Sequence, residues 1–126
     1  MEALTNFKIK SICAQLLVAD IDRSLRFYTE VLGFRIDFQY EDFYVGLVKD
    51  GCSIHLKSGR TLPRQGENKG TEDLDLVFSV FDLEHLYEIL SGKAIDIDQT
   101  LRQMPYGKEF YIADPDGYMI CFFEAS

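Results

Sequence analysis

The sequence has no tryptophan, and its 126 residues include only three cysteines, three prolines and two histidines. The cysteines, Cys13, Cys52 and Cys121, form no closely spaced pair, so the disulfide framework of a small secreted protein is not expected. No apolar run resembles a secretion signal or is long enough to span a membrane, which favours a cytoplasmic protein. The nucleophile elbow, the glycine-rich phosphate loop and the zincin motif are also absent, which argues against the common hydrolases and nucleotide enzymes.

Basic residues are few, because 13 lysines and arginines stand against 21 aspartates and glutamates, for a net charge of −8. This balance argues against binding of nucleic acid or of an anionic membrane surface. The charge is uneven: residues 1–58 carry 8 acidic and 7 basic side chains, whereas residues 59–126 carry 13 and 6. A cationic partner is therefore favoured over an anionic one, although solubility alone would account for the same excess.

An approximate internal repeat is the most informative feature of the chain. Residues 18–21 (VADI) recur as 80–83 (VFDL), where an apolar strand-like run gives way to a helical pattern. Residues 50–56 (DGCSIHL) recur as 116–122 (DGYMICF), a turn followed by a strand. We therefore predict an α+β fold in which the order strand, helix and three strands occurs twice within one domain. Module one covers about residues 8–58, a linker follows at 59–72, and module two covers about 73–124.

Alternation of apolar and polar residues assigns two faces to the first and last strand of each module. One face is wholly apolar and is expected to pack on the helices. In the first strand it consists of Ile12, Ala14, Leu16 and Val18. The other face is mixed, as the wall of a solvated cleft would be.

Four residues of the mixed face could bind a metal ion. The repeat pairs Cys13 with Asp75 and His55 with Cys121, and these side chains would converge if the modules packed as pseudo-symmetric halves. Cysteine, histidine and aspartate are competent zinc ligands. Buried thiols, a hydrogen-bonded histidine and a solvated aspartate would explain the same residues, so both interpretations stay open.

Two motifs resemble the glyoxalase/bleomycin-resistance/dioxygenase superfamily, whose members are also called vicinal oxygen chelate proteins. They are residues 18–28 (VADIDRSLRFY), running on to VLGF at 31–34, and residues 114–118 (DPDGY). The likeness covers about residues 8–124. It implies two paired βαβββ modules whose curved sheets form a cup, with the helices on the outer face.

The same resemblance bears on metal binding. Metal-dependent members place histidine or glutamate at the positions that correspond to Cys13, His55, Asp75 and Cys121. Only His55 has the usual ligand type, so the resemblance implies neither a metal nor another cofactor. The alternative is a metal-dependent glyoxalase-type lyase or extradiol-type dioxygenase that uses His55 and Asp75 in an unusual ligand set. Whether the protein is an enzyme is left open.

A closer likeness is to bleomycin-resistance proteins, which sequester a cationic drug without metal in a groove between subunits. Residues 105–110 (PYGKEF) resemble their Pro-Trp-Gly-Arg-Glu-Phe segment, with Tyr106 in place of the stacking tryptophan. The likeness implies a homodimer that binds an aromatic or cationic small molecule in the cup or at the dimer groove. The ligand-binding residues expected on this basis are Phe38, Phe43, His55, Asp75, Tyr106 and Glu109.

Overall fold

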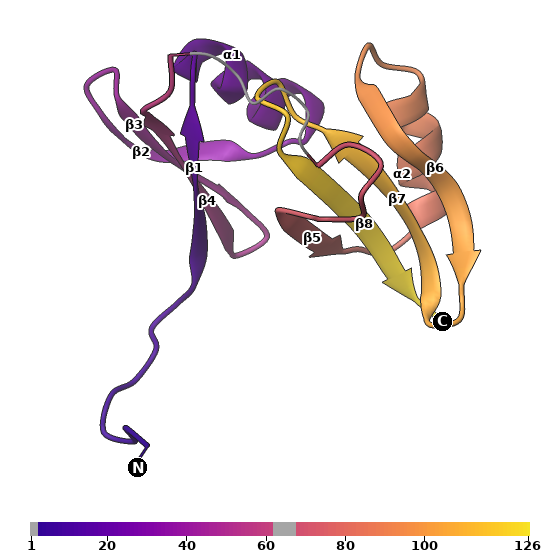
Figure 1. Cartoon of the computed structure of the whole chain (residues 1–126). Coiled ribbons are helices and arrows are strands. Elements are labelled where there is room, and N and C mark those ends of the chain that lie inside the picture. The colour runs from indigo at the N-terminus through magenta and orange to yellow at the C-terminus, as the bar shows by residue number, and fades with distance from the viewer. Residues whose placement is uncertain (1–2, 62–67) are drawn as a thin grey trace.

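The computed structural model describes residues 3–61 and 68–126 (Figure 1). Module one contains β1 (Cys13–Val18), α1 (Ile21–Arg26), the π-helical turn η1 (Phe27–Val31), β2 (Arg35–Tyr40), β3 (Tyr44–Lys49) and β4 (Cys52–Ser58). Module two contains β5 (Leu76–Ser79), α2 (Leu83–Ser91), β6 (Asp96–Met104), β7 (Gly107–Ala113) and β8 (Met119–Ala125). The predicted α+β class and the repeated element order are confirmed. Part of the predicted linker, residues 62–67, lies outside the described residues.

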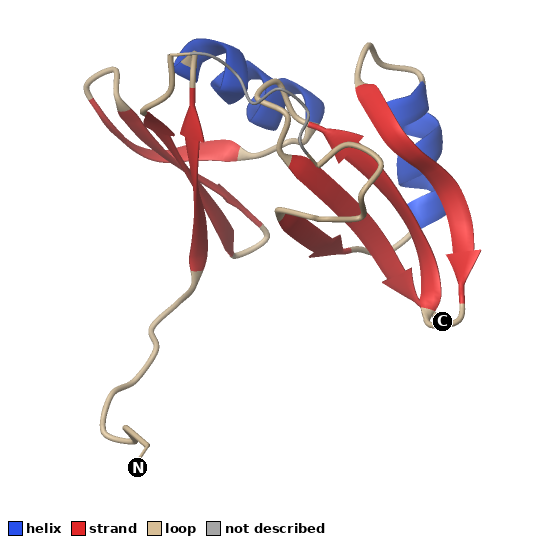
Figure 2. Cartoon of the chain, viewed as in Figure 1, coloured by secondary structure: helices blue, strands red, loops and turns tan. Residues whose placement is uncertain are grey.

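Each module is built on a mixed sheet of four strands, in the orders β1-β4-β3-β2 and β5-β8-β7-β6. In both sheets the first strand runs parallel to the last, which places Gln15 opposite His55 and Val77 opposite Cys121. The remaining neighbours are antiparallel. The two sheets form separate halves of the molecule (Figure 2). None of the described helices is long and apolar enough to cross a membrane.

The helical segment expected after residues 18–21 is divided into a short α-helix and a π-helical turn. Asp20 caps α1 by accepting a hydrogen bond from the backbone N–H of Arg23. After Arg26 the backbone widens into η1, which buries both Phe27 and Tyr28. A π turn adds a residue to the helical turn and so changes which side chains face the core, which the apolar stripe in the sequence does not reveal.

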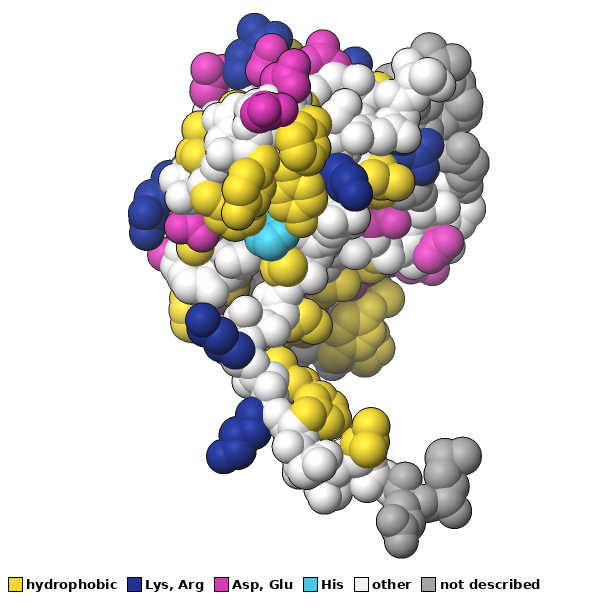
Figure 3. Space-filling view, turned by 90° about the vertical axis from the view of Figure 1, so that its left-hand side faces the viewer, with side chains coloured by type: hydrophobic (Ala, Val, Ile, Leu, Met, Phe, Trp, Pro, Cys, Tyr) yellow, Lys and Arg dark blue, Asp and Glu magenta, His cyan; other side chains and the backbone are white. Residues whose placement is uncertain are grey.

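Residues 3–12 form an extended arm that leaves the sheet (Figure 1). Ile12 is 88% exposed, so its expected place on the buried face is wrong. The reason is that β1 begins at Cys13, so the segment before it pairs with no strand. Hydrophobic side chains remain uncovered along the arm (Figure 3). Leu4, Phe7 and Ile9 are each more than half exposed.

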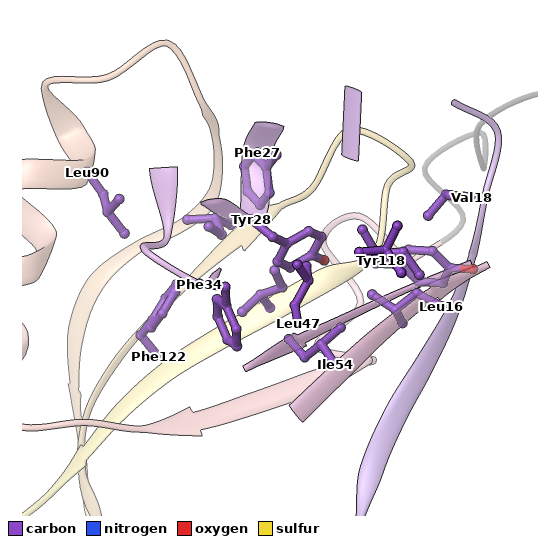
Figure 4. Packing of buried hydrophobic residues seen from close by; sticks show 14 of the residues in the cluster. Leu16, Val18, Phe27, Tyr28, Phe34, Leu47, Ile54, Leu90, Tyr118 and Phe122 are labelled. Carbon is purple, nitrogen blue, oxygen red and sulfur yellow. The ribbon is translucent and has the colours of Figure 1, made fainter. Parts of the chain in front are cut away.

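The hydrophobic core is continuous across both modules (Figure 4). Leu16, Val18 and Ile54 are buried as the alternation predicted. Phe34 of module one meets Phe78 of module two, with 6.1 Å between ring centroids, and Phe78 contacts Phe122 edge to face at 5.2 Å. Burial of this apolar surface is the main stabilising contribution to the fold.

Polar contacts between the two motifs, residues 18–28 and 114–118, also join the modules. The buried Asp116 carboxylate accepts hydrogen bonds from the Ala19 N–H (2.9 Å) and from the Ser24 hydroxyl (3.0 Å). The neighbouring Asp114 carboxylate accepts one from the Tyr28 hydroxyl at 2.7 Å. Burial raises the pKa of Asp114 to about 6. The motifs that carry the family resemblance thus hold the two modules together.

Candidate functional site

His55 is the centre of a polar and aromatic group on the exposed face of module one. Its Nδ1 atom lies 2.8 Å from the Tyr44 hydroxyl on β3 and 3.7 Å from the Cys13 Sγ atom on β1. The Tyr44 hydroxyl donates a hydrogen bond to the Gln15 side-chain oxygen at 3.1 Å. Strand pairing explains this convergence, because β4 lies between β1 and β3 and each strand points alternate side chains to this face.

Aromatic rings surround the imidazole. The Phe38 ring meets the His55 ring edge to face at a centroid distance of 5.2 Å and lies parallel to the Tyr44 ring at 6.1 Å. Tyr40, which is 62% exposed, lies 5.6 Å from Phe38. Gly46 makes room for this arrangement, because a Cβ atom there would lie 2.2 Å from the Phe38 ring. We define the His55 cluster as Cys13, Gln15, Phe38, Tyr40, Tyr44 and His55.

The structure brings together two of the expected ligand-binding residues of module one, Phe38 and His55, but places Phe43 apart from them. Phe43 lies at the turn between β2 and β3 with 44% of its side chain exposed. Among the ring contacts of the described residues, none involves Phe43. It therefore lies at the edge of the hairpin and outside the ring stack.

Glu109 is the centre of a second group, on module two. Its side chain is 4% exposed and accepts hydrogen bonds from Arg102 (2.7 Å), the Tyr111 hydroxyl (2.8 Å) and the Tyr106 hydroxyl (3.2 Å). Burial alone would raise the pKa of Glu109, but these hydrogen bonds outweigh it and lower the pKa below its usual value. Arg102 also binds Glu72. We define the Glu109 cluster as Glu72, Arg102, Tyr106, Glu109 and Tyr111.

The Glu109 carboxylate is covered by its partners, so a ligand approaching this face meets other atoms first. Tyr106 is 53% exposed and its ring rests against Phe123 at a centroid distance of 5.7 Å. The Arg102 guanidinium lies over the Tyr111 ring at 5.3 Å. Tyr106 and Glu72 are the most exposed members of the cluster, since the Glu72 side chain is 62% exposed and the Arg102 side chain only 27%.

The four positions considered for a metal do not form one ligand set. Cys13 and His55 are neighbours on module one, whereas Asp75 precedes β5 and Cys121 lies within β8. The Asp75 carboxylate accepts a hydrogen bond from the Met119 backbone N–H at 2.8 Å. Burial raises the pKa of the Cys121 thiol to about 12, which opposes formation of a thiolate ligand. Across residues 3–61 and 68–126, no group of three or more His, Cys, Asp and Glu side chains is arranged to hold a metal ion.

The contacts described for the two clusters stay within their own modules, and the residues Cys13, His55, Asp75 and Cys121 do not form the expected group among the described residues. The hydrogen bonds and ring contacts described for His55 come from module one, and those described for Glu109 come from module two. Figure 3 views the molecule from the side that module one occupies and shows a histidine beside a hydrophobic patch. Alternation within strands cannot specify how two separate sheets pack, which is why the sequence left this open.

A pocket of about 500 Å³ lies between the modules, on the other side of β1 and β4. Its lining is mostly apolar and includes Ala14, Ile54, Leu76, Phe78 and Phe122. None of the six expected ligand-binding residues lines it. The pocket has the size of a small-molecule site and the character of an extension of the core.

Several residues of the two clusters were not among the expected site residues: Gln15, Tyr40, Tyr44, Arg102 and Tyr111. Gln15 could have been found by aligning the first and last strands of module one in parallel, which places it opposite His55. Arg102 could have been found from the hairpin around residues 105–107, which pairs it with Glu109.

Comparison with known proteins agrees with this architecture. Residues 8–122 match the family model of the Glyoxalase/Bleomycin resistance protein/Dioxygenase superfamily. No curated protein sequence matches the chain.

Solved structures share the fold at low sequence identity. TnmS3, an antibiotic binding protein from Streptomyces sp. CB03234, is 17% identical with a TM-score of 0.74, over 96% of this chain and 100% of that one. TioX from Micromonospora sp. ML1 is 17% identical with a TM-score of 0.72, over 91% and 98%. Lactoylglutathione lyase from Agrobacterium tumefaciens is 18% identical with a TM-score of 0.72, over 93% and 95%. With the family match over nearly its whole length, the chain belongs to the glyoxalase/bleomycin resistance protein/dioxygenase superfamily.

Proposed function

We propose that this protein binds and sequesters an aromatic or cationic small molecule, without a metal ion, on the aromatic face of the His55 cluster. The observation that carries the proposal is the group of three rings beside an imidazole, in which Tyr40 is exposed and Phe38 and Tyr44 are half-buried. Aromatic faces that a soluble protein leaves in water commonly mark a binding surface. A flat or cationic ligand would gain about 0.5–2 kcal/mol from each ring it covers.

A second copy of the chain would complete the site. We propose a homodimer in which the His55 cluster of one protomer faces the Glu109 cluster of the other, because the contacts of each cluster come from its own module and each cluster keeps an exposed tyrosine, Tyr40 or Tyr106. In that arrangement Tyr106 would close over the ligand from the opposite wall. The acidic excess of residues 59–126 would then attract a cation to the groove.

One comparison supports the proposed binding. The neighbour TnmS3 is described as an antibiotic binding protein, which shows that this fold can serve binding. We also propose a cytoplasmic location, because Cys13 and Cys52 are free thiols at the surface, as a reducing compartment would keep them.

A ligand screen followed by variants tests the proposed site. A library of planar aromatic cations, including proflavine, would be screened by thermal shift, and each hit would be titrated by isothermal calorimetry. Phe38→Ala and Tyr106→Ala should each raise the dissociation constant about tenfold. Phe81→Ala is the matched control, because Phe81 is 93% exposed and lies outside both clusters. If both variants bind every hit as tightly as the unchanged protein, the site is wrongly assigned.

Metal analysis separates this proposal from the enzymatic alternative. Protein purified without a histidine tag should contain zinc, nickel and iron only far below one atom per chain. A stoichiometric metal that is lost in His55→Ala would support a lyase or dioxygenase instead.

A further inference from the structure

The N-terminal arm, residues 3–12, has the sequence pattern of a strand but no strand partner among the described residues. Phe7 and Ile9 alternate with Lys8 and Lys10, which is typical of a strand that buries one face. In the structure Phe7 is 62% exposed and Ile9 is 75% exposed, and pairing with β4 begins only at residue 13. Figure 1 shows the arm running away from both sheets. The apolar side chains of the arm therefore lack the surface that their pattern requires.

An open strand edge borders the pocket of about 500 Å³ between the modules. Among the described strands, β5 pairs only with β8, so its other edge has no strand beside it. The pocket is lined by the five consecutive residues 76–80, which include all of β5. Because neighbouring side chains of a strand point to opposite faces, a pocket that contacts all five runs along the strand edge. Ala14, Asp50 and Ile54 lie on other parts of its wall. We call this pocket the β5 slot.

The β5 slot has the chemistry to hold an extended segment. A segment added to a strand edge gains main-chain hydrogen bonds, and pockets beside the edge take its alternate side chains. The lining of the slot includes Leu76 and Phe78, and the arm offers Phe7 and Ile9. Native proteins commonly cover an open edge of this kind. The arm and the slot thus each supply what the other lacks.

The charges of the two segments are opposite. Residues 72–84, which contain β5, carry five acidic and no basic side chains, whereas the arm carries two lysines and no acidic residue. Arg102 and Lys108 pair with two of the acidic residues, Glu72 and Glu84, which leaves an excess of three negative charges. Complementary charge of this kind favours one partner over others and fixes its register.

The arm that enters the slot belongs to a second copy of the chain. β1 continues directly from the arm, and Ala14 of β1 lines the slot, so the chain's own arm would have to reverse its direction just before β1. Residues 3–12 contain neither glycine nor proline, which are the strongest turn signals. An arm of ten extended residues reaches about 33 Å, which is enough to cross to a neighbouring molecule.

We propose that two copies of this chain exchange their N-terminal arms. The arm of each copy pairs along β5 of the other and places Phe7 and Ile9 in its slot. Because the exchange is reciprocal, both copies use the same surfaces and the assembly closes at two chains. This inference goes beyond the proposed function, since the exchange requires no ligand. It would also supply a contact that holds the proposed homodimer together.

Sedimentation equilibrium of the full chain tests the exchange. The unchanged protein should be a dimer, and Ile9→Ser should raise the dissociation constant of the dimer about a hundredfold, because each dimer buries this side chain twice. Ile89→Ser, the same change at an exposed residue of α2, is the matched control and should leave the dissociation constant unchanged. Circular dichroism should show both variants folded, since neither side chain is buried within one chain. A dimer that Ile9→Ser does not weaken would overturn the exchange and keep the proposed homodimer.

Cross-linking identifies the chain that receives the arm. Isotopically heavy and light copies would be mixed in urea, refolded together and treated with a carbodiimide, which joins a lysine to a carboxylate. Mass spectrometry should find Lys8 or Lys10 joined to residues 72–84 in pairs that combine one heavy and one light peptide. Pairs of a single label only would show that the arm folds back on its own chain, and would overturn the exchange.

The exchange and the proposed ligand site can fail separately. A chain that is monomeric at every protein concentration would overturn the exchange and the proposed homodimer together. Tight hits of such a monomer in the ligand screen, weakened by Phe38→Ala, would still support binding on the aromatic face.

Discussion

The buried carboxyl group of Asp114 should make the protein less stable as the pH rises from about 4 to about 6. Burial raises the pKa of Asp114 to about 6 from its usual 3.8, although hydrogen bonds from Tyr28 and from backbone N–H groups act in the opposite direction. Below the lower value both the folded and the unfolded chain hold the proton. Between the two values the unfolded chain releases its proton first, so rising pH favours unfolding. The difference corresponds to about 3 kcal/mol of unfolding free energy.

Asp114→Asn should remove this pH dependence, because asparagine has a similar shape and does not titrate. Urea unfolding followed by circular dichroism suits a chain without tryptophan, and linear extrapolation gives the free energy of unfolding at each pH. The free energy of the variant minus that of the unchanged protein should increase by about 3 kcal/mol between roughly pH 3.5 and pH 7.5. Asp37→Asn, at an exposed aspartate, is the matched control. A difference that stays constant over this range would refute the reasoning, whatever its sign.

Three further changes test other contacts by urea unfolding at neutral pH. Tyr28→Phe removes a buried hydrogen bond to a carboxyl group and should lower the unfolding free energy by about 2 kcal/mol, so an unchanged midpoint contradicts the inter-module contact. Arg102→Met leaves the Glu109 carboxylate buried without its cation and should lower the unfolding free energy by about 3 kcal/mol. Glu109→Gln should restore part of this loss in the double variant. A double variant as unstable as the single one argues against the pair. Gly107→Ala, at φ 147° with a backbone oxygen 2.2 Å from the new Cβ, should cost more than Gly51→Ala, at φ 77° with open space around it, and equal costs would contradict the strain at Gly107.

The repeat and the alternation predicted the two modules and most of the buried faces because these patterns are local. Leu16 and Ile54 are buried as expected, since each strand must turn one face to the core. The alternation of apolar and polar residues continues through Ile12, but strand pairing begins only at Cys13. The predicted buried face was therefore one residue too long. The π turn after Arg26 could not be predicted from the sequence, because the same apolar residues are compatible with an α-helix and with a π-helix.

The candidate site was predictable only in part. Phe38 and His55 meet because sheet order and register within one module follow from the repeated element order. The pairing of Arg102 with Glu109 lies next to the hairpin turn, where the register is regular, so that turn could have predicted it, whereas the register shifts lie farther from the turn, between Ile97 and Arg102. The separation of the two clusters depends on how two complete sheets pack, and no residue pattern along one strand encodes that.

The most direct test of the account is the affinity of a hit from the cation library for Gly46→Ala. A Cβ atom at this position would lie 2.2 Å from the Phe38 ring and so displaces the ring from His55, without removing any aromatic or polar atom. Circular dichroism would confirm that the variant is folded. The dissociation constant of the variant should be about tenfold larger than that of the unchanged protein. An unchanged dissociation constant in the folded variant would contradict the claim that the aromatic face around His55 binds the ligand.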